Sequence, residues 1–175
     1  LGTGGAIKQA FDLFGLDEAV VLNGDTYVQV NYSDFIRKSE NENLAVVLKQ
    51  VENANRYGRV QVENGRIISM REKSPEPTAG LINAGIYKIR RDLFSADLPD
   101  KFSFEKDLLE PQITALKPLY MQSDEYFIDI GVPESYAQAC RELKNVIFGN
   151  PTHKALFLDR DGVINVDKHH LHKIE

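Results

Sequence analysis

Residues 18–25 read EAVVLNGD, four apolar residues followed by a turn and an acidic side chain. A continuous apolar run of this length is typical of a strand buried on both faces of a sheet. A second run, LAVVLKQV at 44–51, follows a helix-like segment, YSDFIRKSENE, for which Ser33 is the predicted N-cap. This alternation predicts an α/β fold, with a doubly wound and mostly parallel sheet covered by helices on both faces.

The rest of the chain extends this pattern in both directions. Asn64-Gly65 between two alternating runs predicts a local hairpin over 59–72. Gly15 is expected to end the first helix, and Pro111 to kink or break a later one. The other expected elements are helices over 4–14, 104–116 and 133–147 and strands over 81–89 and around 119 and 128.

The composition is that of an ordinary globular protein, with 42% hydrophobic and 27% charged residues. A net charge of −5 gives no basic signature for nucleic acid binding. No apolar run approaches the roughly 20 residues of a membrane span. The single cysteine, Cys140, excludes an internal disulfide framework and fits a reducing compartment, so we expect a cytoplasmic protein. A homo-oligomer is one of the assembly states that the sequence permits.

Two aspartates, Asp25 and Asp129, each follow an apolar run and could meet at one edge of the sheet. Mg²⁺ is typically bound by one or two carboxylates together with substrate phosphates, so the pair predicts a Mg²⁺ site. Two alternatives stay open. Asn23-Gly24 is also a hairpin signal, and an Asp before a Gly is often only a turn.

Five ordered motifs resemble the sugar-phosphate nucleotidyltransferase family: LGTGG, VVLNGD, YGRV, REKSPEP with INAGIYKI, and FIDIGVPESY. The resemblance covers residues 1–147. It implies a doubly wound fold and a reaction that joins a nucleoside triphosphate to a sugar 1-phosphate with release of pyrophosphate. It also implies that Asp25 and Asp129 hold the catalytic metal ion.

The same resemblance assigns substrate contacts. It implies that the loop of Gly2, Thr3 and Gly4 meets the nucleobase, where small residues allow close backbone approach. It implies that the sugar pocket contains the following residues: Tyr57, Gly58, Glu72, Lys73, Asn83 and Gly85. Lys73 would pair with the sugar phosphate and Glu72 would accept hydrogen bonds from sugar hydroxyls. Read without the resemblance, a Glu-Lys pair after a strand is usually a solvated surface, and the GTGG segment is a simple helix start.

The family's N-terminal Gly-rich loop, with its Arg and downstream Lys, does not occur in the sequence, which starts LGTGGAIKQA. We therefore expect the chain to be the middle of a longer protein and to be inactive alone. The loss of the preceding strand is expected to expose apolar sheet surface.

Near its end the chain reads FLDRDGVIN at 157–165, and this string resembles the first motif of haloacid dehalogenase phosphatases of the histidinol-phosphate and heptose-bisphosphate branch. The resemblance implies that Asp159 attacks phosphorus, that Asp161 acts as general acid and base, and that both bind Mg²⁺. We expect a nucleotidyltransferase domain at 1–148, a linker at 149–154 and the start of a phosphatase domain at 155–175. A plain Asp-Gly turn is the alternative.

Three histidines, His169, His170 and His172, follow this motif, and an exposed polar loop is favoured over a metal site. A phosphatase and a transferase in one chain suggest consecutive steps. A sugar bisphosphate would be converted to the 1-phosphate and then activated. The resemblance to such fusions points to D-glycero-D-manno-heptose 1-phosphate and GTP. Mannose or glucose 1-phosphate, a phosphatase alone, and a non-catalytic sugar-nucleotide-binding module remain alternatives.

Overall fold

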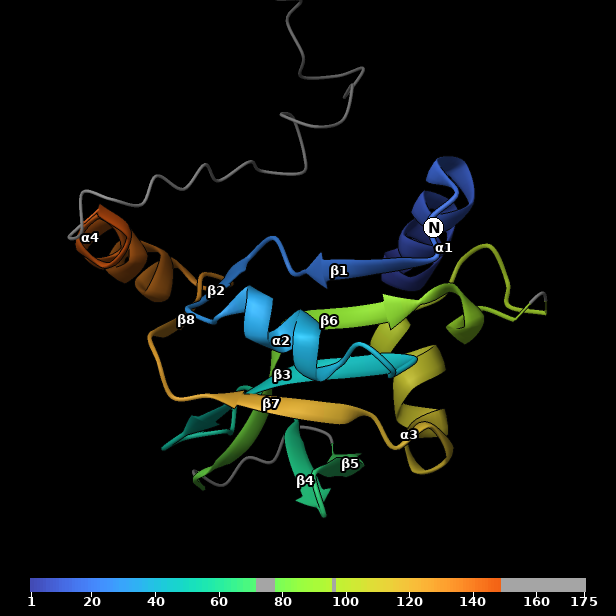
Figure 1. Ribbon diagram of the computed structural model, residues 1–175. Helices are drawn as coiled ribbons and strands as arrows, with labels where there is room; N and C mark the ends of the chain where they lie inside the picture. The colour runs from blue at the N-terminus through green and yellow to red at the C-terminus, as the bar shows by residue number, and fades with distance from the viewer. Residues whose placement is uncertain (72–77, 96, 149–175) are drawn as a thin grey trace, which may run out of the picture. The chain divides into compact units, whose positions relative to one another are not determined.

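The computed structural model describes residues 1–71, 78–95 and 97–148 (Figure 1). The chain divides into two compact units. The first contains residues 1–23 and 28–127, and the second contains residues 24–27 and the chain from residue 128 onward. The predicted linker and phosphatase segment lie outside the described residues, so the proposed domain boundaries stay predictions.

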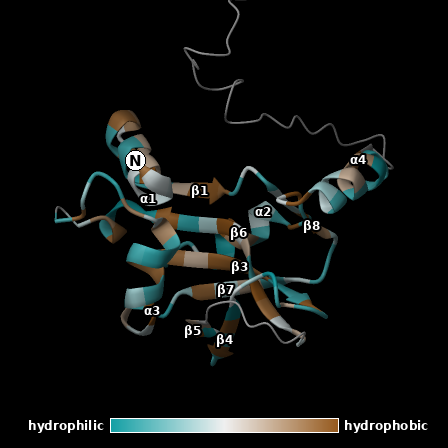
Figure 2. Ribbon diagram, turned by 180° about the vertical axis from the view of Figure 1, so that it is seen from behind, coloured by the Kyte–Doolittle hydropathy of each residue, from teal (hydrophilic) through white to brown (hydrophobic). Residues whose placement is uncertain are grey.

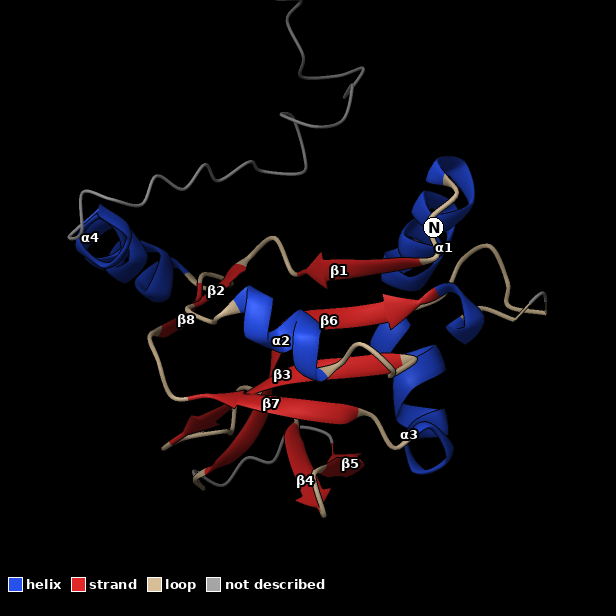
Figure 3. Ribbon diagram, viewed as in Figure 1, coloured by secondary structure: helices blue, strands red, loops and turns tan. Residues whose placement is uncertain are grey.

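The first unit is built on a six-stranded sheet, drawn in red in Figure 3. In spatial order its strands are β1 (Glu18–Leu22), β6 (Gly80–Arg90), β3 (Leu44–Val51), β7 (Leu119–Ser123), β5 (Arg66–Arg71) and β4 (Arg59–Glu63). A separate two-stranded sheet pairs β2 (Thr26–Val28) with β8 (Phe127–Asp129).

The expectation of a mostly parallel sheet is wrong for the described strands. Among the described strands of the six-stranded sheet only β3 and β7 pair in parallel, and β6 runs antiparallel to β1, to β3 and, over a short stretch, to β4. Because β6 is antiparallel to β1 and to β3, these two strands run in the same direction with β6 inserted between them. The common direction of β1 and β3 was predictable from the alternation of strands and helices. The insertion of the long antiparallel strand β6 between them was not, because it depends on pairing between segments that are distant in the sequence.

Helices cover both faces of this sheet, as the alternation predicted (Figure 1). Alternate residues of β3 enter two separate apolar clusters, so β3 is buried on both faces. One cluster contains Phe11 of α1 (Gly2–Phe14) and the apolar side of a π-helical turn, η2 (Phe104–Leu109), with α3 (Glu110–Leu116). The other contains Phe35 of α2 (Tyr32–Lys38). Hydrophobic residues are concentrated on the strands of the sheet in Figure 2.

Two shorter elements complete the description. A single 3₁₀ turn, η1 (Arg91–Leu93), follows β6 in the first unit. In the second unit, α4 (Pro133–Phe148) begins with proline at its first position, as predicted. Within the part of the chain that the structure describes, no helix is long and apolar enough to cross a bilayer.

Most of the predicted local signals act as expected. Gly15 ends α1 in the left-handed conformation, and Asn64-Gly65 turns the β4–β5 hairpin with both φ angles positive. Pro111 lies in the first turn of α3, where the π-helical turn gives way to an α-helix. The predicted N-cap of α2 is wrong by two residues. The cap is Asn31, whose side chain accepts a hydrogen bond from the Asp34 N–H.

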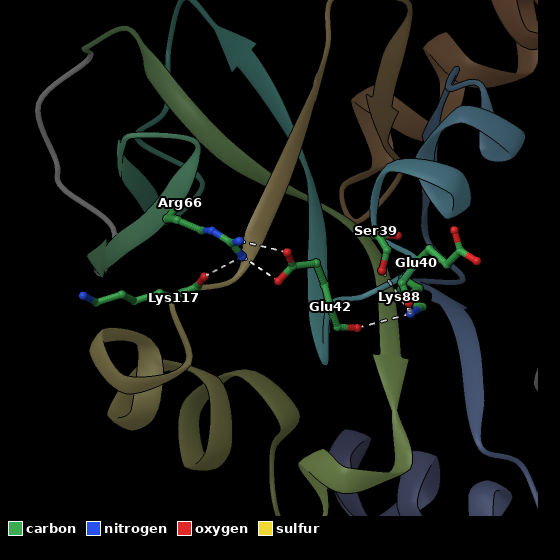
Figure 4. Close-up of polar contacts among 6 residues, drawn as sticks. All are labelled: Ser39, Glu40, Glu42, Arg66, Lys88 and Lys117. Carbon is green, nitrogen blue, oxygen red and sulfur yellow. Dashed lines mark hydrogen bonds and ion pairs between the residues drawn. The ribbon is translucent and has the colours of Figure 1, made fainter.

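A buried lysine on β6 anchors the C-terminal end of α2 (Figure 4). Lys88 is 1% exposed, and its Nζ donates to the carbonyl oxygens of Ser39 and Glu42 at 3.1 and 3.2 Å. The same Nζ lies 3.0 Å from the Glu18 carboxylate. Ser39 is the C-cap of α2, and carbonyls at the end of a helix lack intrahelical partners and carry partial negative charge, so a cation satisfies this carbonyl well.

Candidate functional site

The two predicted metal-binding aspartates belong to neighbouring segments of the two-stranded β2–β8 sheet, and not to the six-stranded sheet at whose edge they were expected. Asp25 is in the turn that precedes β2, and Asp129 is the last residue of β8. The Ile130 N–H donates to the Asp25 carbonyl oxygen at 2.9 Å, which joins the two segments through their backbones. The structure therefore joins, through the backbone, the segments of two aspartates that are 104 positions apart in the sequence (129 minus 25).

The alternative of a hairpin at Asn23-Gly24 is excluded by the strand pairing. β1 pairs with β6, whereas β2 pairs with β8, so the strands on either side of this turn belong to different sheets. Asp25 is exposed, and Asp129 is half-buried with one carboxylate oxygen accepting the Gly131 N–H at 2.7 Å. That bond fixes the rotation of the Asp129 side chain.

The described residues do not form a metal site from protein ligands alone. Over the described ranges, no group of three or more His, Cys, Asp or Glu side chains is placed to hold a metal ion. Two aspartates in neighbouring segments nevertheless suit a Mg²⁺ ion, which takes its remaining ligands from water and substrate phosphates. The donor set therefore suits a cation that binds together with its substrate.

The segment of Gly2, Thr3 and Gly4 is the first turn of helix α1 and not a loop. The N–H groups of Gly4 and Gly5 point at the Phe102 carbonyl oxygen. A Cβ atom on Gly4 would lie 2.2 Å from the Phe102 ring, so the small residue is required by packing. Packing alone explains the glycines here, and the predicted nucleobase contact stays a prediction.

Of the residues predicted for the sugar pocket, Asn83 and Gly85 lie together on β6. Gly85 has φ +74°, and a Cβ there would meet the Asn23 side chain at 2.6 Å. Tyr57 packs edge-to-face on Phe127 at 5.9 Å between ring centroids, so the loop that contains Tyr57 and Gly58 contacts the start of β8. Lys73, Glu72, Asp159 and Asp161 lie outside the described residues.

Sequence reasoning missed two residues that contact Asn83. Its Nδ2 donates to the Tyr87 hydroxyl at 2.7 Å and to the Glu105 carboxylate at 2.8 Å, and the Tyr87 hydroxyl donates to the same Glu105 oxygen. Burial, followed by the nearby Glu105 carboxylate, raises the pKa of Tyr87 well above its ordinary value. The hydroxyl therefore stays protonated and can donate. No local signal indicated Glu105, because its partner is 22 residues away on another element.

The first unit also has a cavity between the segment before β3 and the end of α3. It is lined by Asn41, Glu42, Asn43, Leu44, Ala115 and Leu116. None of the predicted site residues belongs to this lining.

Comparison with known proteins agrees with the motifs. The family model described as nucleotidyl transferase matches residues 1–146. The chain is 39% identical over 150 residues to D-glycero-alpha-D-manno-heptose 1-phosphate guanylyltransferase of Aneurinibacillus thermoaerophilus, covering 84% of this chain and 65% of the relative. The protein of the same name from Campylobacter jejuni is 42% identical over 137 residues, covering 78% of this chain and 60% of the relative.

Solved structures share the fold of this chain. The crystal structure of HddC from Yersinia pseudotuberculosis superposes with a TM-score of 0.73 at 37% identity, covering 82% of this chain and 63% of that one. The structure of the same protein complexed with GMP-PN gives a TM-score of 0.72 with the same identity and coverage. The chain thus spans 60–65% of the length of the two curated relatives. Since the family model covers most of the chain and the fold agrees, this protein belongs to the nucleotidyl transferase family.

Proposed function

We propose that the complete natural protein containing this sequence transfers a guanylyl group from GTP to a D-glycero-D-manno-heptose 1-phosphate. A phosphate oxygen of the sugar 1-phosphate attacks the α-phosphorus of GTP, the bond between this phosphorus and the bridging oxygen breaks, and pyrophosphate leaves. The observation that carries the proposal is the likeness, at 39% and 42% identity, to two heptose 1-phosphate guanylyltransferases. The neighbouring structure that contains GMP-PN supports the choice of guanine.

The pair of Asp25 and Asp129 supports phosphoryl chemistry at the end of the β2–β8 ribbon. We propose that they hold Mg²⁺, which when bound offsets the charge of the phosphates during in-line attack. The Gly131 N–H, bonded to one oxygen of Asp129, orients the other oxygen. Preorganised carboxylates reduce the rearrangement that is needed when the substrates bind.

The remaining site residues have proposed roles in holding the substrates. Lys73 pairs with the phosphate of the sugar, and Glu72 accepts hydrogen bonds from its hydroxyls. The sugar also meets Tyr57, Gly58, Asn83 and Gly85, while Gly2, Thr3 and Gly4 lie toward the nucleobase. Within the first unit, the edge-to-face packing of Tyr57 on Phe127 supports the sugar-binding loop.

The first experiment measures pyrophosphate release by the complete natural protein with Mg²⁺. Each nucleoside triphosphate is tested against heptose, mannose and glucose 1-phosphates. We expect the highest kcat/KM for GTP with the heptose. A higher value with mannose or glucose would replace the proposed sugar, and no turnover with any pair would favour a sugar-nucleotide-binding module.

A matched substitution separates an enzyme from a binding module. Asp25→Asn removes one charge and keeps the side-chain shape, so we expect kcat/KM for pyrophosphate release to fall at least about 100-fold. Omitting Mg²⁺ should produce a comparable loss in the unchanged protein. Unchanged sugar-nucleotide affinity without any turnover, in the variant and in the original protein alike, would support the binding module.

We also propose a phosphatase in the same protein, on the basis of the FLDRDGVIN string at 157–165. The Asp159 carboxylate would attack the phosphorus of a sugar bisphosphate while Asp161 donates a proton to the leaving sugar oxygen, and water would then hydrolyse the aspartyl phosphate. Asp159→Asn is expected to abolish phosphate release and to preserve pyrophosphate release. If the original protein releases no phosphate from heptose 1,7-bisphosphate, this second activity is excluded.

A further inference from the structure

Strand β6 is interrupted by a bulge at Gly85. Val46 of β3 pairs with Tyr87, and Leu48 pairs with Asn83, so four steps along β6 match only two along β3. Gly85 takes up the irregularity with φ +74°, a conformation that L side chains rarely adopt. In a regular strand, residues four apart are separated by about 13 Å between Cα atoms. The bulge instead lets the Asn83 and Tyr87 side chains meet at 2.7 Å.

The contacts of Asn83 fix the orientation of its amide group. Its Nδ2 donates to Tyr87 at 2.7 Å and to Glu105 at 2.8 Å, and its Oδ1 accepts the Gly85 N–H at 3.0 Å. A flipped amide would set Oδ1 against the Glu105 carboxylate and the NH₂ group against the Gly85 N–H. Both contacts would be repulsive, so only one orientation satisfies the site.

This orientation determines what a ligand can do at Asn83. The NH₂ group donates to Tyr87 and to Glu105, two acceptors of the protein itself that also contact each other. The Oδ1 atom has two lone pairs, and among the described residues the Gly85 N–H uses one. Asn83 is half-buried and therefore still reachable. A ligand that bonds to the Oδ1 atom must donate a hydrogen, as a sugar hydroxyl does.

We infer that Glu105 is a positioning residue that turns Asn83 into a dedicated hydrogen-bond acceptor, so that the site selects a sugar by the hydroxyl it presents there. The inference rests on the proposed function, because the proposed function places a sugar 1-phosphate at Asn83. Glu105 need not touch the sugar. Its carboxylate accepts one hydrogen bond from Asn83 and one from Tyr87, and it acts through these two bonds.

The position of Glu105 is itself held by distant parts of the first unit. Glu105 lies in the π-helical turn Phe104–Leu109, a helix type that is often found at functional sites. The Phe104 N–H at the start of that turn donates to the Thr3 hydroxyl at 2.9 Å. The Phe104 ring packs edge-to-face on the Tyr87 ring at 5.1 Å between centroids. The GTGG segment and β6 thus hold the turn from two sides.

The test compares Glu105→Ala with Glu105→Gln in the complete natural protein, using heptose 1-phosphate and its monodeoxy analogues. Glu105→Ala frees the Asn83 amide, so we expect the KM for the sugar to rise about tenfold and the KM for GTP to stay constant. Discrimination against one monodeoxy analogue should be lost. Glu105→Gln keeps an acceptor oxygen at the same reach and should restore most of the discrimination. Glu40→Ala, at an exposed glutamate, is the matched control and should change neither constant.

The outcomes separate this inference from the proposed function. If the original protein turns over and Glu105→Ala only lowers the Tm, with the same discrimination among analogues, Glu105 has a structural role and the inference is overturned. If the original protein shows no turnover, the proposed function fails, and calorimetric binding of the same sugar phosphates replaces the kinetics. Equal affinities of the original protein and Glu105→Ala for every analogue, or no binding at all, would then overturn the inference.

Discussion

Strand β6 carries a polar cluster on each of its faces, and the two clusters differ in what they leave available to a ligand. Lys88 is 1% exposed, and its Nζ donates to the carbonyl oxygens of Ser39, Glu40 and Glu42 and pairs with the carboxylate of Glu18. Asn83 lies on the other face with Tyr87 and is half-buried. Among the described residues, its Oδ1 accepts only the Gly85 N–H, which leaves one lone pair for a ligand. Both clusters satisfy buried polar groups, as a stable core requires.

This difference separates a structural anchor from a recognition group. A buried cation whose donors are all used by its own chain has nothing left for a substrate, although it is the kind of side chain that often attracts functional interpretation. An amide whose NH₂ group already donates to its own chain, and whose oxygen keeps a lone pair, prefers a ligand that donates a hydrogen bond. The number of unused hydrogen-bonding positions, rather than burial or charge, therefore indicates which cluster can recognise a ligand.

The largest expected effect comes from breaking the Lys88 cluster. Lys88→Met keeps the length of the side chain but leaves the end of α2 without its cation, and we expect a loss of about 3 kcal/mol in the free energy of unfolding. Urea denaturation measures this loss. Lys101→Met, at an exposed lysine, should stay within about 0.5 kcal/mol. A variant with unchanged stability but weaker sugar binding would assign Lys88 to the ligand and reverse the comparison.

The bulge that builds the Asn83 cluster can be tested at Gly85. Gly85→Ala would force a Cβ to within 2.6 Å of the Asn23 side chain at a positive φ, so we expect a loss of about 2 kcal/mol in stability. Gly24→Ala is the control for stability, since a Cβ there meets nothing within 4 Å. Denaturation curves that coincide for Gly85→Ala and the original protein would show that the bulge tolerates a side chain.

Removing the Tyr87 hydroxyl should have a smaller effect, because Glu105 still accepts from Asn83. We expect Tyr87→Phe to cost about 1 kcal/mol at neutral pH. Burial raises the pKa of Tyr87 above its ordinary value of 10.0, so the unfolded chain loses this proton first. Stability from this group is complete below pH 10 and falls as the pH rises toward the folded pKa.

The pH dependence therefore gives a sharp readout for Tyr87. Above pH 10 the free energy of unfolding of the original protein should decline more steeply than that of Tyr87→Phe. Guanidinium denaturation of both proteins at several alkaline pH values measures the two slopes. Parallel slopes would mean that the Tyr87 hydroxyl ionises equally easily in the folded and unfolded protein, which contradicts its buried place beside Glu105.

The smallest expected effect on stability comes from the ion pair of Arg66 with Glu42, the residue whose carbonyl oxygen also accepts from Lys88. Arg66 forms two hydrogen bonds with the Glu42 carboxylate at 2.6 and 2.8 Å (Figure 4). The hydrogen bond from Arg66 lowers the pKa of Glu42 from its ordinary value of 4.5. The stability that the ion pair contributes is therefore complete above pH 4.5, the ordinary pKa of the carboxyl group. It is lost as the pH falls through the lower pKa of Glu42 in the folded protein. We expect Glu42→Gln to cost about 0.5 kcal/mol at pH 7 and less at pH 3.

Denaturation at these two pH values, with Glu52→Gln as an exposed control, measures the Glu42 contribution. Added salt should reduce the difference, since Arg66 is 38% exposed at its side chain. A cost above about 2 kcal/mol would exceed what a partly exposed ion pair supplies and would place Glu42 with Lys88 in one cooperative anchor.

Local features of the fold were predictable from the sequence because they depend on neighbouring residues. Gly15, Asn64-Gly65 and Pro133 act at their own positions, and the apolar run of β3 is buried as its composition indicates. The direction of β6 was not predictable, because antiparallel insertion between β1 and β3 depends on pairing between segments that are distant in the chain. Periodicity specifies an element but not its neighbours.

By itself, the sequence determined the alternation of strands and helices, the hairpin, and the family to which the motifs belong. It also indicated Asp25 and Asp129 as candidate metal ligands. Asp129 ends β8, whereas Asp25 lies in the turn before β2, and a backbone hydrogen bond joins the two segments. Only the tertiary structure decided that Glu105 and Tyr87 hold Asn83, because the contact depends on a bulge at Gly85 and on a turn 20 residues further along the chain (105 minus 85). Hydrogen bonds are short-ranged and directional, so their partners become known only when the chain has folded.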